Sequence, residues 1–105
     1  MQNVVVLFNS KEFTAPMYDK AWEDLRSEGF SNPKGLLSHV AYVNADGAMD
    51  VVDVWESADA FAEFGKALGP IMQKSGVNLP EPKIIPAHNF YQVQAELAWW
   101  RIEQA

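Results

Sequence analysis

The sequence predicts one α+β domain with the element order strand, helix, strand, strand, helix, strand. Three observations support this order. Four runs rich in apolar and β-branched residues are typical of strands: residues 3–9, 36–43, 48–56 and 83–93. Between them, residues 14–29 and 57–76 repeat apolar side chains at helical spacing. Turn-forming residues separate the segments. An antiparallel sheet with two helices on one face, in this order, is the split βαβ or ferredoxin-like arrangement.

The first helix has clear start and stop signals. Thr14 is a plausible N-cap, Pro16 falls in the first turn, and Gly29 stands where a left-handed glycine ends a helix. Its apolar side chains recur every three or four residues: Tyr18, Ala21, Trp22 and Leu25. This pattern indicates packing against the sheet, so Tyr18 and Trp22 are interpreted first as core residues.

The second helix is predicted to begin after Ser57, a candidate N-cap, and to end at Gly76. One stripe of it is apolar: Phe61, Phe64, Leu68, Ile71 and Met72. Gly69 and Pro70 interrupt that stripe. Because proline removes an amide donor and disfavours helical geometry before it, we expect a kink or two helical pieces here.

The two middle strands are predicted to form a hairpin through Asp46-Gly47, a strong short-range turn signal. A loop of two or four residues gives the same facing of the side chains. One face then carries Ser38, Val40, Tyr42, Met49, Val51, Asp53 and Trp55, and the other carries Leu37, His39, Ala41, Val43, Asp50, Val52 and Val54. Both faces are mostly apolar, whereas two helices cover only one. The sequence therefore predicts a homodimer in which two sheets pack into one α/β barrel.

In the last strand, Pro86 indicates an edge position or a bulge. The predicted domain covers residues 1–93, and a tail follows at 94–105. Trp99, Trp100 and Ile102 have no place in the four-stranded plan, so the tail is expected either to fold back on its own chain or to pack as a helix on a partner.

Composition narrows the classes of partner. The chain has 105 residues, of which 49% are hydrophobic, and this composition argues against disorder. A formal net charge of −6 argues against nucleic acid as a partner. The absence of cysteine excludes disulfides and thiol chemistry. No signal peptide and no apolar run of about 20 residues is visible, so we expect a cytoplasmic protein that does not span a membrane.

Residues 46–90 resemble the second half of the dimeric α/β-barrel proteins, in the broad group of antibiotic-biosynthesis-monooxygenase-like domains. The likeness lies in "VWES" (54–57), "AFAEF" (60–64), "LGP" (68–70) and "PAHN" (86–89). It implies a small protein without a cofactor, either a monooxygenase-like or isomerase-like enzyme acting on an aromatic or polyketide-like compound, or a non-catalytic binding protein.

Haem-degrading relatives in that group use an asparagine, a tryptophan and a histidine. Asn9 could match the asparagine, but Phe64 stands in place of the tryptophan and residues 57–76 contain no histidine. The resemblance therefore does not imply haem degradation.

The candidate catalytic residues are His88, His39 and Asp53. Histidine is the side chain most easily poised as an acid or base near neutral pH, and His88 belongs to the "PAHN" likeness. Asp53 lies among apolar strand residues and must find donors or a cavity. It either moves a proton or is held structurally by buried donors.

Four further side chains are predicted to line a ligand pocket: Tyr42, Trp55, Trp22 and Asn9. The aromatic members would hold a planar ligand, but the same residues would also suit a core or an interface. No spacing motif indicates a metal site, so none is predicted.

Overall fold

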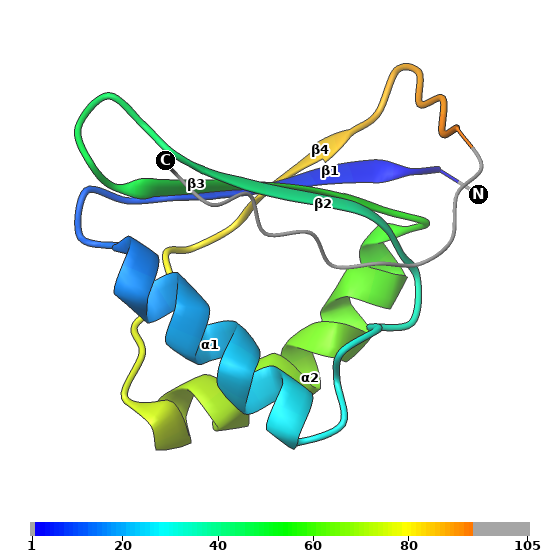
Figure 1. Cartoon of the computed structure of the whole chain (residues 1–105). Coiled ribbons are helices and arrows are strands. Elements are labelled where there is room, and N and C mark those ends of the chain that lie inside the picture. Colours follow the sequence, from blue (N-terminus) through cyan, green and yellow to red (C-terminus); the bar gives the residue numbers. More distant parts are fainter. Residues whose placement is uncertain (1, 94–105) are drawn as a thin grey trace.

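In the computed structural model, which describes residues 2–93, a four-stranded antiparallel sheet carries two helices on one face (Figure 1). The elements are β1 (Val4–Asn9), α1 (Ala15–Ser27), β2 (Leu36–Val43), β3 (Met49–Trp55), α2 (Ala58–Ser75) and β4 (Lys83–Pro86). The strands lie in the order β2-β3-β1-β4. The predicted ferredoxin-like fold is confirmed. The predicted tail at 94–105 lies outside the described residues.

The predicted helix boundaries are confirmed by their caps. The side chain of Thr14 accepts a hydrogen bond from the amide of Met17 at 3.4 Å, and that of Ser57 accepts one from the amide of Ala60 at 3.1 Å. At the other ends, Gly29 and Gly76 have φ of +91° and +74°. Local chemistry therefore sets where both helices begin and end.

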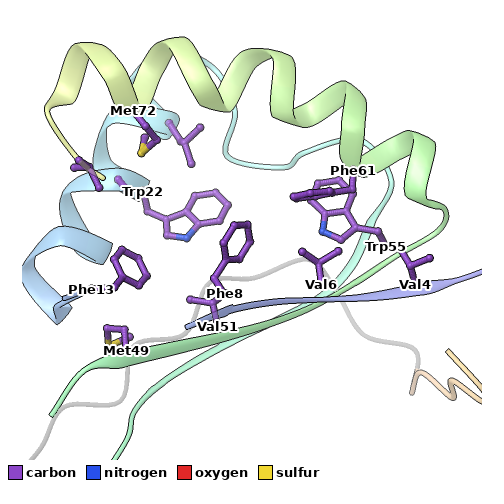
Figure 2. Close-up of a cluster of buried hydrophobic side chains, with 13 residues drawn as sticks. Val4, Val6, Phe8, Phe13, Trp22, Met49, Val51, Trp55, Phe61 and Met72 are labelled. Carbon is purple, nitrogen blue, oxygen red and sulfur yellow. The ribbon is translucent and has the colours of Figure 1, made fainter. Parts of the chain in front are cut away.

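Pro70 lies inside α2, which runs as one helix from Ala58 to Ser75. The expectation of two helical pieces is therefore wrong. Pro70 is exposed, so its ring needs no place in the core, and the missing amide leaves the carbonyl of Lys66 without its usual helical donor. The ribbon of α2 passes over the core in Figure 2, and a bend near Gly69-Pro70 stays a prediction.

The core lies between the helices and the inner face of the sheet (Figure 2). Alternate residues of β1 and β3 point into it, and Trp55 and Val6 have no exposed surface. Its other large members come from both helices and the loop before α1: Phe13, Trp22, Leu25, Phe61 and Met72. Burial of each such side chain contributes about 1.5–3 kcal/mol to stability.

The hairpin between β2 and β3 differs from the prediction in register. Val43 pairs with Met49, and the amide of Asn44 donates to the carbonyl of Ala48 at 2.7 Å, so three residues form the loop. The side-chain oxygen of Asn44 accepts from the amide of Asp46, and Gly47 takes φ of +83°. An odd loop length inverts the facing of β2 relative to β3.

As a result, His39 and Ala41 share the inner face with Asp53, whereas Ser38, Val40 and Tyr42 lie on the outer face. The predicted sharing of a face by Tyr42 and Asp53 is therefore wrong. The outer face is still largely apolar, as predicted. Its apolar members are Val5, Leu7, Val40, Tyr42, Val52, Val54 and Ile85.

β4 is shorter than predicted, because it ends at Pro86 and residues 87–93 form no strand. Pro86 pairs with Val4, the first residue of β1, and the amide of Ala87 donates to the carbonyl of Asn3 at 2.9 Å. The edge position of Pro86 is confirmed, since β4 is an outer strand of the sheet.

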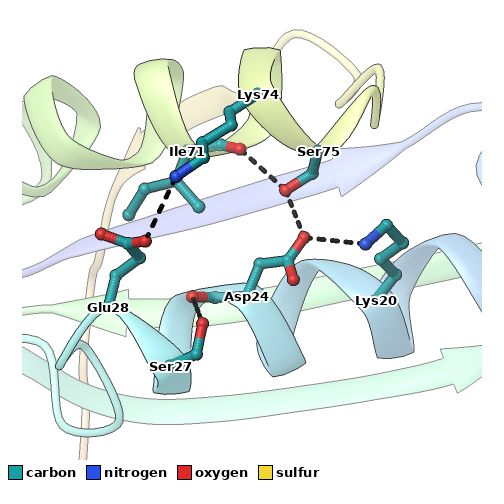
Figure 3. A network of polar contacts seen from close by, with 7 residues as sticks. All are labelled: Lys20, Asp24, Ser27, Glu28, Ile71, Lys74 and Ser75. Carbon is teal, nitrogen blue, oxygen red and sulfur yellow. Dashed lines mark hydrogen bonds and ion pairs between the residues drawn. The ribbon is translucent and has the colours of Figure 1, made fainter.

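Polar contacts join α1 to α2 away from the sheet (Figure 3). The hydroxyl of Ser75 hydrogen-bonds the carboxylate of Asp24, and Lys20 Nζ lies 3.2 Å from Asp24 Oδ2. The bond from Ser75 and then the contact with Lys20 lower the pKa of Asp24. Lys74 Nζ and Glu28 Oε2 lie 3.9 Å apart nearby. These contacts fix the helices side by side over the sheet.

Neither helix within residues 2–93 has the length and apolar character needed to cross a membrane.

Candidate functional site

Asp53 lies at the centre of β3 and points toward the helices. It is 5% exposed, and both of its carboxylate oxygens accept hydrogen bonds. Oδ1 lies 2.6 Å from His39 Nδ1, and Oδ2 accepts from the indole nitrogen of Trp55 at 3.2 Å. The buried carboxylate is thus satisfied by one donor on each oxygen, which fixes the plane of the group.

His39 pairs directly with Asp53 across β2 and β3. Because an ionised carboxylate only accepts, Nδ1 of His39 carries the proton of this contact. The other ring nitrogen, Nε2, lies 2.6 Å from the hydroxyl of Tyr18 on α1. In a neutral imidazole, Nε2 is then the acceptor and Tyr18 the donor. Four side chains therefore form one hydrogen-bonded chain, in the order Tyr18, His39, Asp53 and Trp55.

Aromatic rings hold the imidazole from two sides. The ring of Trp22 meets it edge-on, with centroids 5.2 Å apart and planes at 76°. The ring of Tyr18 is nearly parallel to it, with centroids 5.9 Å apart and planes at 12°. Only 10% of the His39 side chain is exposed. Rings and hydrogen bonds together leave the imidazole little freedom to rotate.

A cavity of about 50 Å³ opens beside this chain. Its lining is apolar except for Tyr18, His39 and Asp53. The other members are Phe8, Phe13, Ala21, Trp22, Leu25, Val51, Phe64, Leu68 and Leu79. Such a volume holds a few water molecules, whereas a pocket that encloses a drug-sized ligand measures about 300–1,000 Å³. Polar chemistry is confined to one wall of a small apolar space.

This arrangement has the parts of a general base. A carboxylate bonded to Nδ1 of a histidine fixes the tautomer and stabilises the imidazolium that forms when Nε2 takes a proton. The low dielectric of an apolar cavity strengthens both effects. Nε2 of His39 is occupied by the hydroxyl of Tyr18, so the histidine can accept a proton from that hydroxyl, or from a substrate hydroxyl or acidic C–H group that displaces it.

Three of the predicted site residues meet here: His39, Asp53 and Trp22. Trp55 contacts Asp53 but is wholly buried beneath it. Tyr18 belongs to the site, although its helical spacing indicated only a core residue. A hydroxyl on the buried stripe of a helix needs a partner, and that requirement was the available signal.

The remaining predicted residues lie elsewhere. Tyr42 is on the outer face, where its hydrogen bond to Asp50 raises its pKa. Asn9 is exposed at the end of β1. His88 is exposed in the segment after β4, not within a strand, and does not line the cavity.

Among residues 2–93, no three His, Asp or Glu side chains converge as a metal site would require. No family model matches the chain, and no curated protein does so.

One solved structure that matches is described as a monooxygenase from the gene ActVA-Orf6 of Streptomyces coelicolor, in complex with the ligand Nanaomycin D. The two chains are 20% identical, with a TM-score of 0.45, over 90% of this chain and 93% of the other. A match at this identity and TM-score transfers neither a function nor a ligand to the present chain.

Proposed function

We propose that this protein is an enzyme that removes a proton from a small aromatic compound, with His39 as the general base and Asp53 as the residue that orients it. The observation that carries the proposal is the 2.6 Å contact between His39 Nδ1 and Asp53 Oδ1 in the wall of an apolar cavity. A cavity lined only by apolar side chains would instead have favoured a binding protein.

The reactions open to a deprotonated substrate are those of the two enzyme classes that the sequence resemblance implies, isomerases and monooxygenases. The anion left by the substrate can be reprotonated at another atom, which is isomerisation, or can react with dioxygen, which is oxygenation without a cofactor. In both cases the protein's task is to accept the proton at Nε2 and to exclude water. The aromatic walls, Trp22 and Phe64, suit a planar substrate.

The cavity must widen for such a substrate, since about 50 Å³ does not admit an aromatic ring. Two lining residues, Phe13 and Leu79, belong to neither a helix nor a strand. Phe13 is fixed in the core at 2% exposure, whereas Leu79, between α2 and β4, is only half-buried. We propose that the segment carrying Leu79 moves to admit the substrate.

We also propose that the outer face of the sheet packs on a second copy of the chain. Val40 and Tyr42 on this face are 55% and 49% exposed, and Ile85 is 45% exposed. A contiguous apolar face of this kind is typical of an interface. A second copy presents the same face, so the two sheets bury each other symmetrically.

The alternative function is non-catalytic binding of a small molecule. The largely apolar lining of the cavity favours this reading. The two functions are separated by the fate of the ligand, because a binding protein releases it unchanged.

The test of the enzyme is incubation of the protein with a panel of hydroxylated aromatic compounds in deuterated buffer. Mass spectrometry then measures deuterium incorporation and oxygenated products. We expect turnover that His39→Gln abolishes and that His88→Gln, the matched change of an exposed histidine, leaves intact. Equal turnover by wild type and His39→Gln would refute the role of His39. Thermal stabilisation by a compound that is recovered unchanged would favour the binding protein.

The test of the dimer is sedimentation equilibrium. Wild type is expected at twice the chain mass of 11.8 kDa. Val40→Lys places a charge on the outer face and should shift the population to monomer, whereas Ala62→Lys, on an exposed position of α2, should not. A single wild-type species at the chain mass would refute the dimer.

A further inference from the structure

The geometry points to a second activity at this site: we propose that the hydroxyl of Tyr18 is an activated nucleophile that accepts an acyl group from an activated ester. The inference rests on the proposed function in one respect, namely that Asp53 holds His39 as a proton acceptor. It adds a covalent step that proton transfer to His39 does not require.

The first step of the argument is connectivity. Tyr18 Oη lies 2.6 Å from His39 Nε2, and His39 Nδ1 lies 2.6 Å from Asp53 Oδ1. A hydroxyl, an imidazole and a carboxylate in this order are the parts by which enzymes activate an oxygen nucleophile, with the base oriented by a third group. Here a phenol occupies the place of the hydroxyl.

The second step is access. Tyr18 is partly buried on α1 and lines the cavity, so the hydroxyl adjoins a space that a small acyl donor can approach. His39 is less accessible, because its Nδ1 is occupied by Asp53 and its Nε2 by Tyr18. An electrophile in the cavity therefore meets the tyrosine oxygen before it meets Nε2.

The third step is the reaction itself. Tyr18 Oη attacks the carbonyl carbon of the ester while its proton passes to His39 Nε2. The bond between that carbon and the leaving oxygen breaks, and the alcohol or phenol departs as its anion. Tyr18 then carries the acyl group as an aryl ester, and His39 returns its proton to water. No oxidant, metal or further reactant is needed.

The chain offers two matched controls, because its other tyrosines lie in different environments. Tyr91 is 82% exposed, so it reports the reactivity of an accessible phenol. Tyr42 is bonded to Asp50, which raises its pKa and so lowers its phenolate fraction. We expect acylation in the order Tyr18, Tyr91, Tyr42.

The experiment uses p-nitrophenyl acetate, of which only the small acetyl group has to enter the cavity of about 50 Å³, with the whole protein at pH 7.5. Release of p-nitrophenolate is followed by absorbance, and the acetylated tyrosine is identified by peptide mass spectrometry. General base catalysis raises the rate of such a step about 10²–10⁴-fold, and the partial burial of Tyr18 reduces that rate gain. Acetylation of Tyr18 is therefore expected to be at least about tenfold faster than that of Tyr91. Urea-unfolded protein should show no preference.

Two variants decide the interpretation. Tyr18→Phe keeps the ring and should lose the fast phase, and His39→Gln should slow the labelling of Tyr18 to the rate of Tyr91. If Tyr18→Phe keeps the wild-type rate while His39→Gln loses it, the inference about Tyr18 is overturned and the base role of His39 stands. If neither variant differs from wild type and Tyr18 is not preferred, the inference is overturned, and activation by His39, on which the proposed function depends, is contradicted as well.

Discussion

Replacing Asp53 by alanine tests whether the polar chain is a structural element as well as a chemical one. The change removes the acceptor of two buried donors, the indole N–H of Trp55 and Nδ1–H of His39. A buried donor left without a partner costs about 1–3 kcal/mol, so the two together set a range of about 2–6 kcal/mol.

Two effects reduce that sum. His39 can move its proton to Nε2 and donate it to the oxygen of Tyr18. The indole N–H of Trp55 cannot change its position in this way. Removing the carboxylate also relieves its own cost of burial. We therefore expect Asp53→Ala to lower the free energy of unfolding by about 2–4 kcal/mol, or the melting temperature by about 10–25 °C.

Asp53→Asn separates stability from chemistry. The amide oxygen of asparagine can accept from Trp55, while its NH₂ group donates to Nδ1 of His39 in the other tautomer. Every buried group then keeps a partner, so the expected loss of stability is about 1 kcal/mol or less. Nε2 now carries the proton and cannot act as a base, so activity should fall about 10³- to 10⁴-fold.

The assay is urea unfolding followed by tryptophan fluorescence, at one protein concentration because dimerisation would couple stability to it. Nitrogen-15 shifts of the imidazole report the tautomer of His39. The control is Asp50→Ala on the outer face of the same strand, with an expected loss below about 1 kcal/mol. An Asp53→Ala protein within about 0.5 kcal/mol of wild type would refute the accounting of buried donors.

Three further changes test local features. Asp24 has a lowered pKa in the folded protein, so its stabilising contribution is complete above the ordinary value of 3.8 and is lost as the pH falls through the lower folded value. In urea melts, Asp24→Asn should lower the free energy of unfolding at pH 7 and reduce the decline of that free energy below pH 3.8. Wild-type and variant profiles that run parallel with pH would contradict this. Gly47→Ala should lower the free energy of unfolding by about 1–2 kcal/mol, because φ at this residue is +83°. Gly65→Ala should raise it by about 0.5–1 kcal/mol, because Gly65 lies inside α2 and the added carbon has nothing within 4 Å. Ser57→Ala should cost about 1 kcal/mol in a thermal melt, with Ser57→Asp, which keeps an acceptor, close to wild type.

The elements that sequence predicted well depend on neighbouring residues. Thr14 and Ser57 cap helices through amides three residues away, and Gly29 and Gly76 end them through their own backbone freedom. The edge position of Pro86 also follows from a local property, its missing amide. Such contacts can be inferred without knowing the rest of the fold.

The site could be predicted only in part, because it depends on register. The sequence identifies Asp53 as a buried carboxylate, but the predicted hairpin register places Tyr42, and not His39, on its face of the sheet. The difference arises at Asn44, whose side-chain oxygen accepts from the amides of Asp46 and Ala48 and so shapes a three-residue loop. The Asp46-Gly47 dipeptide alone did not distinguish this loop from an even-numbered one.

Tyr18 was missed for a related reason. Its bond to His39 joins residues 21 positions apart on different elements, and periodicity records only which face of the helix is apolar. The predicted β4 is longer than the observed one because the ladder ends at the pairing of Pro86 with Val4 and the bond from Ala87 to Asn3, and this depends on the partner segment and not on residues 83–93 alone.

The loop at residues 45–47 has a consequence for how this protein can change during evolution or design. Surface loops usually tolerate insertions and deletions. Here, adding or removing one residue while the strands stay paired would turn His39 outward and bring Val40 beneath the helices. The hydrogen-bonded pair of His39 and Asp53, the dyad, would then be lost although neither residue had been replaced. Length changes of two residues would preserve the dyad. Functional homologues should therefore differ in the length of this loop only by even numbers.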